Sequence, residues 1–228
     1  MEADYKYLFN KFLHYLSNSK EAKHFYLEGG YVLSFVYKLS RKFSRDIDFT
    51  ISKKELVETF VERSVFILSN IIKDFYYKRR ENKIIVYKKN DYLFDIDYYY
   101  LSSKYFEFQE VDLFSEKNKF TFNIHTIKDI LCEKILNIVQ SNRFEFKDVV
   151  DINLIVKTNS EVKDLSRLLQ IKSDKKNNFA NKSRIDDVIY SEMLRFKTSH
   201  KENFNDYNFY KEFEKLLNNL KILFYEKE

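Results

Sequence analysis

The sequence predicts an α+β protein in which a mixed sheet with flanking helices is followed by a helical bundle. Up to about residue 125, short segments with apolar side chains at every second position alternate with segments of helical spacing. From Thr126 onward the apolar side chains recur only at helical spacing. We therefore expect two domains, an α/β domain over residues 1–125 and a helical domain over residues 126–228.

The predicted elements follow from the apolar patterns in chain order. Residues 5–17 have helical spacing, 24–28 are a short strand, 31–39 a helix, and 45–51 alternate as a strand does. Ser52 and Glu55 have the spacing of a capping box for a helix that runs to about Ile72. The remaining expected elements are strands over 74–80, 83–89, 92–100 and 119–125, a polar connection over 102–119, helices over 127–139, 146–155, 161–170, 184–197 and 206–225, and a loop over 172–183.

Composition narrows the class of protein. A chain of 228 residues with 44% hydrophobic and 18% aromatic residues is long and apolar enough to bury a core, which excludes a disordered chain. The formal net charge of +5 does not by itself require nucleic acid. The lone Cys132 excludes an intramolecular disulfide framework. No apolar run approaches about 20 residues, and the N-terminal residues lack the layout of a signal peptide, so we expect a cytoplasmic protein without a membrane partner.

The two glycines of the chain are adjacent, Gly29 and Gly30, and there is no proline. Average usage would give about 16 glycines in a chain of this length. Glycine is needed where φ is positive or where the backbone approaches another group closely. The pair lies between a predicted strand and a predicted helix, and the N–H groups at such a helix start suit a phosphate. The alternative is a tight turn with no ligand.

Two short acidic motifs lie in predicted strands. Asp46 and Asp48 project from one face of the strand predicted over 45–51. Asp95 and Asp97 repeat the pattern in the strand predicted over 92–100. Carboxylates at i and i+2 are about 6.5–7 Å apart along a strand, so like charges repel unless a cation lies between them. Oxygen-rich sites of this kind suit Mg²⁺. Each motif alone is also compatible with a solvated strand face.

Taken together, these motifs resemble a known family. The segment LEGGYVLSFVYKLSRKFSRDIDF closely resembles the first motif of the AbiEii/MenT-type nucleotidyltransferases, which are toxins within the DNA polymerase beta-like superfamily. Lys42, Ser44 and the Asp46–Phe49 segment match that motif. Tyr31 departs from it, since Ser or Thr often follows the glycines, and Lys42 stands where Arg is commoner.

The helical half carries a second resemblance. Residues 127–152 are similar to the later motifs of the same family, in which a helix with a lysine is followed by an arginine and by a helix with two acids three residues apart. Lys134, Arg143, Asp148 and Asp151 fall on those positions. The alternatives are a solvated lysine on a helix and a surface ion pair.

The resemblance implies a nucleotidyltransferase that moves a nucleoside monophosphate from an NTP to an acceptor hydroxyl, with Mg²⁺ as cofactor. It implies Asp46, Asp48 and a third acid, Asp95 or Asp97, as metal ligands, and Asp95 is favoured. It makes Asp46, Asp48 and Asp95 catalytic, together with Lys134 and Asp148. The residues it implies for the nucleotide and its phosphates are Gly29, Gly30, Tyr31, Lys42, Ser44, Lys134 and Asp151.

The sequence leaves alternatives for the acceptor of the nucleotide and for the partners of the protein. The resemblance favours a tRNA 3′ end as acceptor and an antitoxin protein encoded nearby as partner. The basic clusters Lys78–Arg80 and Lys172–Lys182 are either an RNA path or solvated loops. The alternatives are transfer to a small molecule of the aminoglycoside kind, and a non-catalytic relative that only binds nucleotide.

Overall fold

The structure is a computed structural model. It describes residues 2–39, 46–115, 118–139 and 146–158, and in the remainder residues 165, 167–169, 171–172, 187, 191, 211–212, 214–216 and 218–219. The chain divides into two compact units, Met1–Thr126 and Ile127–Glu228, which are described one at a time.

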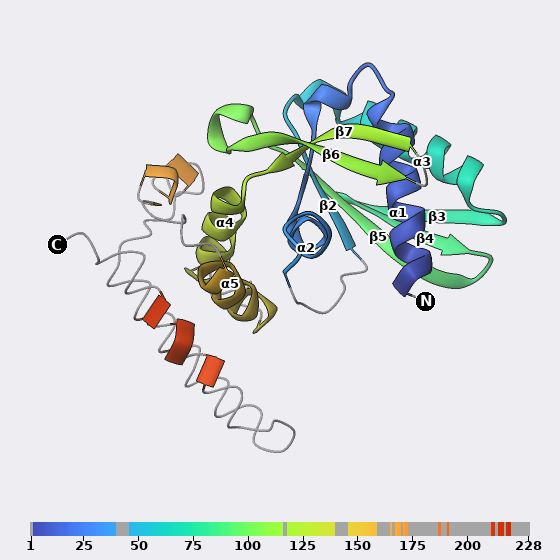
Figure 1. The fold of residues 1–228 in the computed structure, drawn as a ribbon. Helices are drawn as coiled ribbons and strands as arrows, with labels where there is room; N and C mark the ends of the chain where they lie inside the picture. Colours follow the sequence, from blue (N-terminus) through green and yellow to red (C-terminus); the bar gives the residue numbers. More distant parts are fainter. Residues whose placement is uncertain are drawn as a thin grey trace. The chain divides into compact units, whose positions relative to one another are not determined.

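The first unit is built on a seven-stranded mixed sheet (Figure 1). Its strand order is β3-β4-β5-β2-β1-β7-β6. The strands are β1 (Phe25–Glu28), β2 (Asp46–Ile51), β3 (Phe75–Arg80), β4 (Lys83–Lys88), β5 (Asp91–Tyr100), β6 (Phe108–Ser115) and β7 (Asn118–His125). β2 pairs with β5 and β1 with β7 in parallel, and all other neighbours are antiparallel.

Two helices cover the apolar face of the sheet, α1 (Glu2–Ser17) and α3 (Val57–Ile71). Phe9 of α1 packs edge-on against Phe94 of β5, with ring centroids 4.8 Å apart. Phe60 of α3 lies 5.0 Å from Phe49 of β2. Because side chains alternate along a strand, this packing assigns the odd residues of β2 to the core and leaves Asp46 and Asp48 on the opposite face.

The diglycine segment begins a short helix, α2 (Gly29–Tyr31), that continues as a π-helical turn over Val32–Val36. The predicted helix over 31–39 is therefore confirmed in outline, with a wider turn than an α-helix has. The helix of residues 5–17 and the strands at 24–28, 45–51, 74–80, 83–89, 92–100 and 119–125 are confirmed as well.

Two predictions within this unit are wrong. The connection expected over 102–119 contains β6, an edge strand whose side chains are mostly exposed on both faces, so it lacks the apolar alternation that reveals a buried strand. Ser52 does not cap α3: a 3₁₀ turn over Lys54–Leu56 precedes that helix, and the Ser52 hydroxyl is hydrogen-bonded to the ring of His24 at 3.1 Å.

The described part of the second unit is helical. It contains α4 (Ile127–Val139) and α5 (Phe146–Thr158), which contact each other, and helical residues at 167–169 and 171–172. α4 buries the apolar stripe that the sequence predicted, including Leu131, Ile135 and Leu136. A complete helical bundle remains a prediction. Within the described residues, no helix is both long and apolar enough to cross a bilayer.

Candidate active site

Four carboxylates lie in register on the face of the sheet opposite α1 and α3. β2 and β5 are parallel neighbours, with Asp46 beside Asp95 and Asp48 beside Asp97. Residues directly opposite on neighbouring strands share a face, and adjacent strands are about 4.8 Å apart. The two acidic motifs that the sequence places about fifty residues apart are therefore brought together.

Lys83 of β4 lies against this acidic group, and no sequence motif had pointed to this residue. Its Nζ is 2.8 Å from Oδ2 of Asp95 and 3.2 Å from Oδ2 of Asp97. Burial acts to lower the pKa of Lys83, but its bonds to the two carboxylates outweigh this and raise it. Burial also raises the pKa of Asp97, more than the attraction of Lys83 lowers it. Lys83 thus pairs with the two acids that β5 contributes to this face.

Gly29 lies directly against this group. Its φ is +68°, a backbone conformation that L side chains rarely adopt, and a Cβ added to it would be 2.1 Å from Oδ2 of Asp48. Both reasons to keep a glycine, a positive φ and a close approach, thus hold at this position. The diglycine corner and the acidic strand face are one site.

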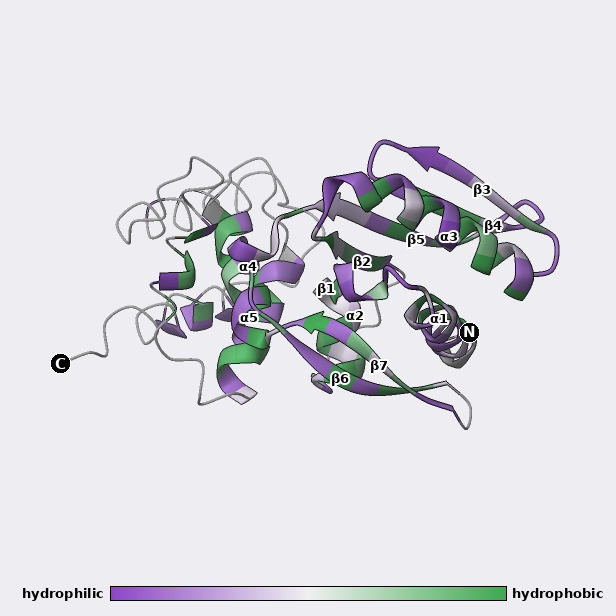
Figure 2. Ribbon diagram, turned by 90° about the horizontal axis from the view of Figure 1, so that it is seen from above, coloured by the Kyte–Doolittle hydropathy of each residue, from purple (hydrophilic) through white to green (hydrophobic). Residues whose placement is uncertain are grey.

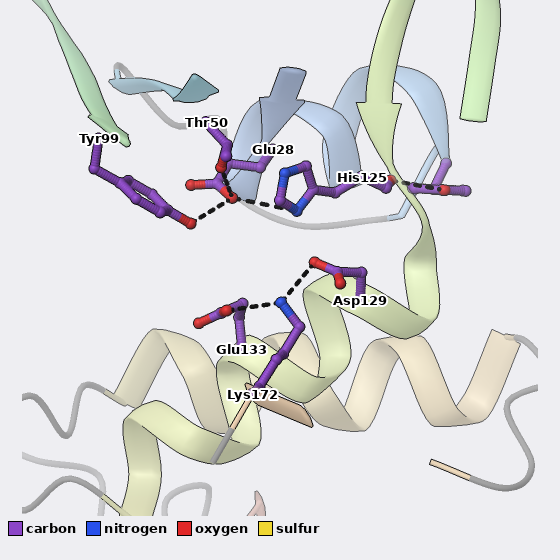
Figure 3. Close-up of polar contacts among 8 residues, drawn as sticks. Glu28, Thr50, Tyr99, His125, Asp129, Glu133 and Lys172 are labelled. Carbon is purple, nitrogen blue, oxygen red and sulfur yellow. Dashed lines mark hydrogen bonds and ion pairs between the residues drawn. The ribbon is translucent and has the colours of Figure 1, made fainter. Parts of the chain in front are cut away.

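Glu28 is a further residue that the sequence did not single out. It pairs with Asp48 across β1 and β2 and is buried. Figure 3 shows its Oε2 accepting hydrogen bonds from the hydroxyls of Thr50 and Tyr99, each at 3.0 Å, with Nδ1 of His125 at 3.4 Å. These contacts come from β2, β5 and β7, so they fix the residue that precedes Gly29. These four residues are distant in the sequence, and only the pairing of the strands shows that their side chains meet.

Tyr31 is corrected in part. Its side chain is 1% exposed and its hydroxyl donates to Oδ1 of Asn10 on α1 at 2.6 Å. Its ring packs edge-on against Phe9, and burial raises the pKa of its hydroxyl. The expectation that this side chain binds phosphate is wrong, because it belongs to the core. Its backbone N–H is in the first turn of α2, where such groups lack helical partners.

In the second unit, Lys134, Asp148 and Asp151 form a buried ion-paired group. Nζ of Lys134 is 2.5 Å from Oδ1 of Asp148 and 2.9 Å from Oδ2 of Asp151. Burial acts to lower the pKa of Lys134, but the two carboxylates raise it above its usual value. Burial also raises the pKa of Asp148, as expected where two acids share one buried cation. The structure thus brings together three residues that the sequence selected on separate helices.

A second buried lysine, Lys172, pairs with two carboxylates of α4 (Figure 3). Nζ of Lys172 is 2.9 Å from Oδ2 of Asp129 and 2.8 Å from Oε1 of Glu133, and its side chain is 2% exposed. Lys172 is helical, so the loop predicted from residue 172 does not begin there. The expectation that Lys172 lines an RNA path is wrong, because its ammonium is enclosed by two carboxylates. Residues 173–182 lie outside the described residues.

Comparison with known proteins gives the chain a family. The model of the nucleotidyl transferase AbiEii toxin family, of type IV toxin–antitoxin systems, matches residues 11–219. The chain belongs to this family. A search of curated proteins gives no match.

One solved structure agrees with the AbiEii assignment at the level of the fold. The structure of a candidate nucleotidyltransferase from H. pylori aligns with 97% of this chain and 93% of its own, at a TM-score of 0.57 and 15% identity. An antigenic nucleotidyltransferase-like protein from Paracoccidioides brasiliensis aligns with 78% of this chain and 93% of its own, at a TM-score of 0.40 and 13% identity. The first of these supports a nucleotidyltransferase fold for this AbiEii chain.

The acidic face of this AbiEii chain has donors that suit a divalent cation. Oδ1 of Asp95 is buried and has no hydrogen-bond partner within the described residues, although the other oxygen of that carboxylate binds Lys83. Carboxylate oxygens are the donors that Mg²⁺ prefers. In the same part of the chain, no three His, Cys, Asp or Glu side chains are already gathered closely enough to hold an ion. Binding a cation would therefore require Lys83 or the carboxylates to move.

Three expected residues of the AbiEii motifs lie outside the described residues. They are Lys42, Ser44 and Arg143.

Proposed function

We propose that this chain transfers a nucleoside monophosphate from an NTP to an acceptor hydroxyl, with a divalent metal ion, most suitably Mg²⁺. The observation that carries the proposal is the register of Asp46 with Asp95 and of Asp48 with Asp97, directly beside the Gly29 corner. Membership of the AbiEii family supports it.

The carboxylates of Asp46, Asp48 and Asp95 would hold the metal, with Asp97 as a further ligand. When bound, such ions neutralise phosphate charge and stabilise the entering and leaving oxygens of an in-line displacement. Within the described part of the chain, Oδ1 of Asp95 is buried without a hydrogen-bond partner. The Asp95 side chain is also less exposed than that of Asp97 on the same strand, at 14% against 34%. We therefore assign Asp95 as the third acid and the acceptor of the proton from the attacking hydroxyl.

The backbone N–H groups at the start of α2, from Gly29 to Tyr31, would bind the triphosphate oxygens, since a helix start attracts anions. A glycine at position 29 lets the backbone approach Asp48 closely, so phosphate and metal ligands share one small volume. Following the family motifs, Lys134 would neutralise phosphate charge, while Asp148 and Asp151 hold its ammonium in place. Lys42 and Ser44 keep their predicted phosphate role.

The acceptor is the finer part of the proposal. We assign RNA, and within it a tRNA 3′ end, and we assign an antitoxin as the cellular partner that the family implies. Transfer to an aminoglycoside is the second candidate. The carboxylates on both strands argue against a non-catalytic relative, because like charges in register on neighbouring strands repel unless a cation binds between them.

The test is labelling of an acceptor. The protein is incubated with Mg²⁺, each α-labelled NTP in turn, and either total RNA or an aminoglycoside. We expect labelled RNA from the wild type and none from Asp48→Asn. The matched control is Asp112→Asn, which makes the same change on the exposed edge strand β6 and should label as the wild type does. Equal labelling by Asp48→Asn would contradict the metal role, and a labelled aminoglycoside with unlabelled RNA would select the second candidate.

A further inference from the structure

The hairpin of β3 and β4 continues the face of the sheet that carries the acids. Ile84 and Val86 of β4 are fully buried in the core, so Lys83, Ile85 and Tyr87 point to the opposite face. The register places Arg80 beside Lys83 and Tyr76 beside Tyr87, which assigns these β3 residues to the same face.

A single row of side chains crosses five strands here and reverses charge along its length. It runs from Arg80 to Lys83, Asp97, Asp48 and Glu28, each residue directly opposite the next. The positive end lies on the hairpin and the negative end beside the Gly29 corner. Two strand spacings, about 10 Å, separate Arg80 from Asp97 along this row.

The hairpin carries an unusual share of the positive charge of the chain. Residues 75–90 contain six basic side chains and one acidic one, Glu81, so their net charge of +5 equals that of all 228 residues. β3 lies at the edge of the sheet and is hydrophilic along most of its length (Figure 2). Charged residues often protect an edge strand from pairing, which explains the lysine and arginines but not the exposed tyrosines beside them.

Aromatic rings are interleaved with these cations. Tyr76 is 50% exposed, and its ring centroid is 5.6 Å from that of Tyr87. Nζ of Lys78 lies 5.6 Å above the ring of Tyr87. Exposed rings that stack bases, next to cations that contact phosphates, are the features by which proteins bind single-stranded nucleic acid.

The other side of the same strand differs. Arg79 points toward α3, where its guanidinium forms a two-bonded ion pair with Glu58 at 2.7 and 2.5 Å and donates to the hydroxyl of Tyr98. Tyr77 stacks on Phe75, with ring centroids 5.8 Å apart. The two faces of β3 thus carry the same residue types, Tyr76 and Arg80 on one face and Tyr77 and Arg79 on the other. Only the face of Tyr76 and Arg80 adjoins the acids.

We infer that the face formed by Tyr76, Lys78, Arg80 and Tyr87 binds the single-stranded 3′ end of the acceptor RNA and guides its terminal hydroxyl to the acids. The inference rests on the proposed function. In-line displacement needs the attacking and leaving oxygens on opposite sides of the phosphorus. The Gly29 corner, proposed for the triphosphate, and this basic aromatic face flank the acids from opposite sides, along the row that ends at Glu28 and at Arg80.

The test measures RNA binding separately from transfer. A fluorescently labelled single-stranded RNA of about 12 nucleotides, within the site size of such surfaces, is titrated with the full chain without NTP, and anisotropy is recorded at several salt concentrations. We expect Tyr76→Ala to weaken binding at least about fivefold, the lower end of what stacking one base contributes, while Tyr77→Ala leaves it unchanged. We expect Arg80→Gln to reduce the slope of log K against log salt by about 0.7, the value for one phosphate of a single strand, and Arg79→Gln to leave it unchanged.

Several outcomes overturn the inference. A wild type that does not bind the RNA overturns it, as do equal losses in Tyr76→Ala and Tyr77→Ala. A concentration-dependent dimer in sedimentation that Tyr76→Ala abolishes would instead assign this face to a second copy of the chain. The proposed function is judged by labelling alone: a wild type that labels RNA while all four variants bind and label equally keeps the function and rejects this face.

Discussion

The carboxylate of Asp48 occupies the space that a side chain on Gly29 would need. Its Oδ2 would be 2.1 Å from an added Cβ, and Gly29 has a φ of +68°. Two independent constraints, conformation and contact, act on one residue. This explains why a chain with two glycines in 228 residues keeps one at this position.

Gly29→Ala is therefore expected to impair both stability and transfer. A residue held in a left-handed conformation costs about 1–3 kcal/mol, and the Asp48 carboxylate must also move. Urea unfolding should show a loss of at least about 1 kcal/mol, with little RNA labelling. Gly30→Ala is the control, because Gly30 has no positive φ and lies in the first turn of α2. Wild-type stability and labelling in Gly29→Ala would show that the close contact is unimportant.

Lys83→Met should increase the response of the protein to divalent metal. Lys83 is the cation that binds Asp95 and Asp97 in the absence of metal, and without it the four carboxylates repel one another more strongly. We expect a lower Tm without metal and a larger rise of Tm on adding Mg²⁺ than the wild type shows, measured by thermal unfolding. Lys54→Met, on an exposed lysine beyond the far end of β2, is the control. An identical Mg²⁺ response in Lys83→Met and the wild type would mean that metal and lysine do not compete.

Tyr99→Phe tests the group around Glu28. The Tyr99 hydroxyl donates to Oε2 of Glu28 at 3.0 Å, and hydrogen bonds to charged groups contribute about 1.5–3 kcal/mol. We expect a loss in the free energy of unfolding near the lower end of that range and weaker Mg²⁺–NTP binding, because this hydrogen bond helps to fix Glu28, the residue directly before Gly29. The control is Tyr100→Phe on the next, exposed tyrosine. Equal effects from the two variants would leave Glu28 without a positioning role.

The order of helices and strands in the first unit is largely predictable, because β2, β4, β5 and β7 each present buried apolar residues at alternate positions. β6 could not be predicted in this way, since an edge strand exposes most of its side chains on both faces. The capping box predicted at Ser52 did not form, because its hydroxyl instead makes a tertiary contact, the hydrogen bond between Ser52 and His24.

The candidate site was predictable only where it depends on local motifs. The diglycine corner and both acidic pairs are visible in the sequence, because period two alone assigns each pair to one face. That Asp46 lies beside Asp95 depends on the pairing of β2 with β5, which no local pattern specifies. Lys83 and Glu28 were missed for the same reason. For Lys172 the error was the reverse, since a lysine at the start of a polar run was predicted to be solvent-exposed but is buried. Its partners Asp129 and Glu133 are about forty residues away in the sequence, so no local pattern reveals them.

The buried Lys172 should make stability fall at alkaline pH. Burial acts to lower the pKa of Lys172, but Glu133 and Asp129 raise it above the ordinary value of 10.5. A lysine whose pKa is raised in the folded state stabilises the fold fully below its unfolded pKa, and this contribution is lost as pH rises through the folded pKa.

We therefore compare the free energy of unfolding of the wild type and Lys172→Met from pH 8 to the alkaline limit of folding. Near neutral pH, the variant should lose about 3–5 kcal/mol, because it leaves two buried carboxylates without their cation. Above about pH 10.5, the advantage of the wild type should shrink by up to about 1.4 kcal/mol per pH unit, since the unfolded chain has released the proton that the folded chain still holds. The contribution of Lys134 is present in both proteins and cancels in the difference. Lys157→Met, on an exposed lysine of α5, should change little at any pH. A difference between the wild type and Lys172→Met that stays constant across this range would show that Lys172 is not held protonated by Asp129 and Glu133.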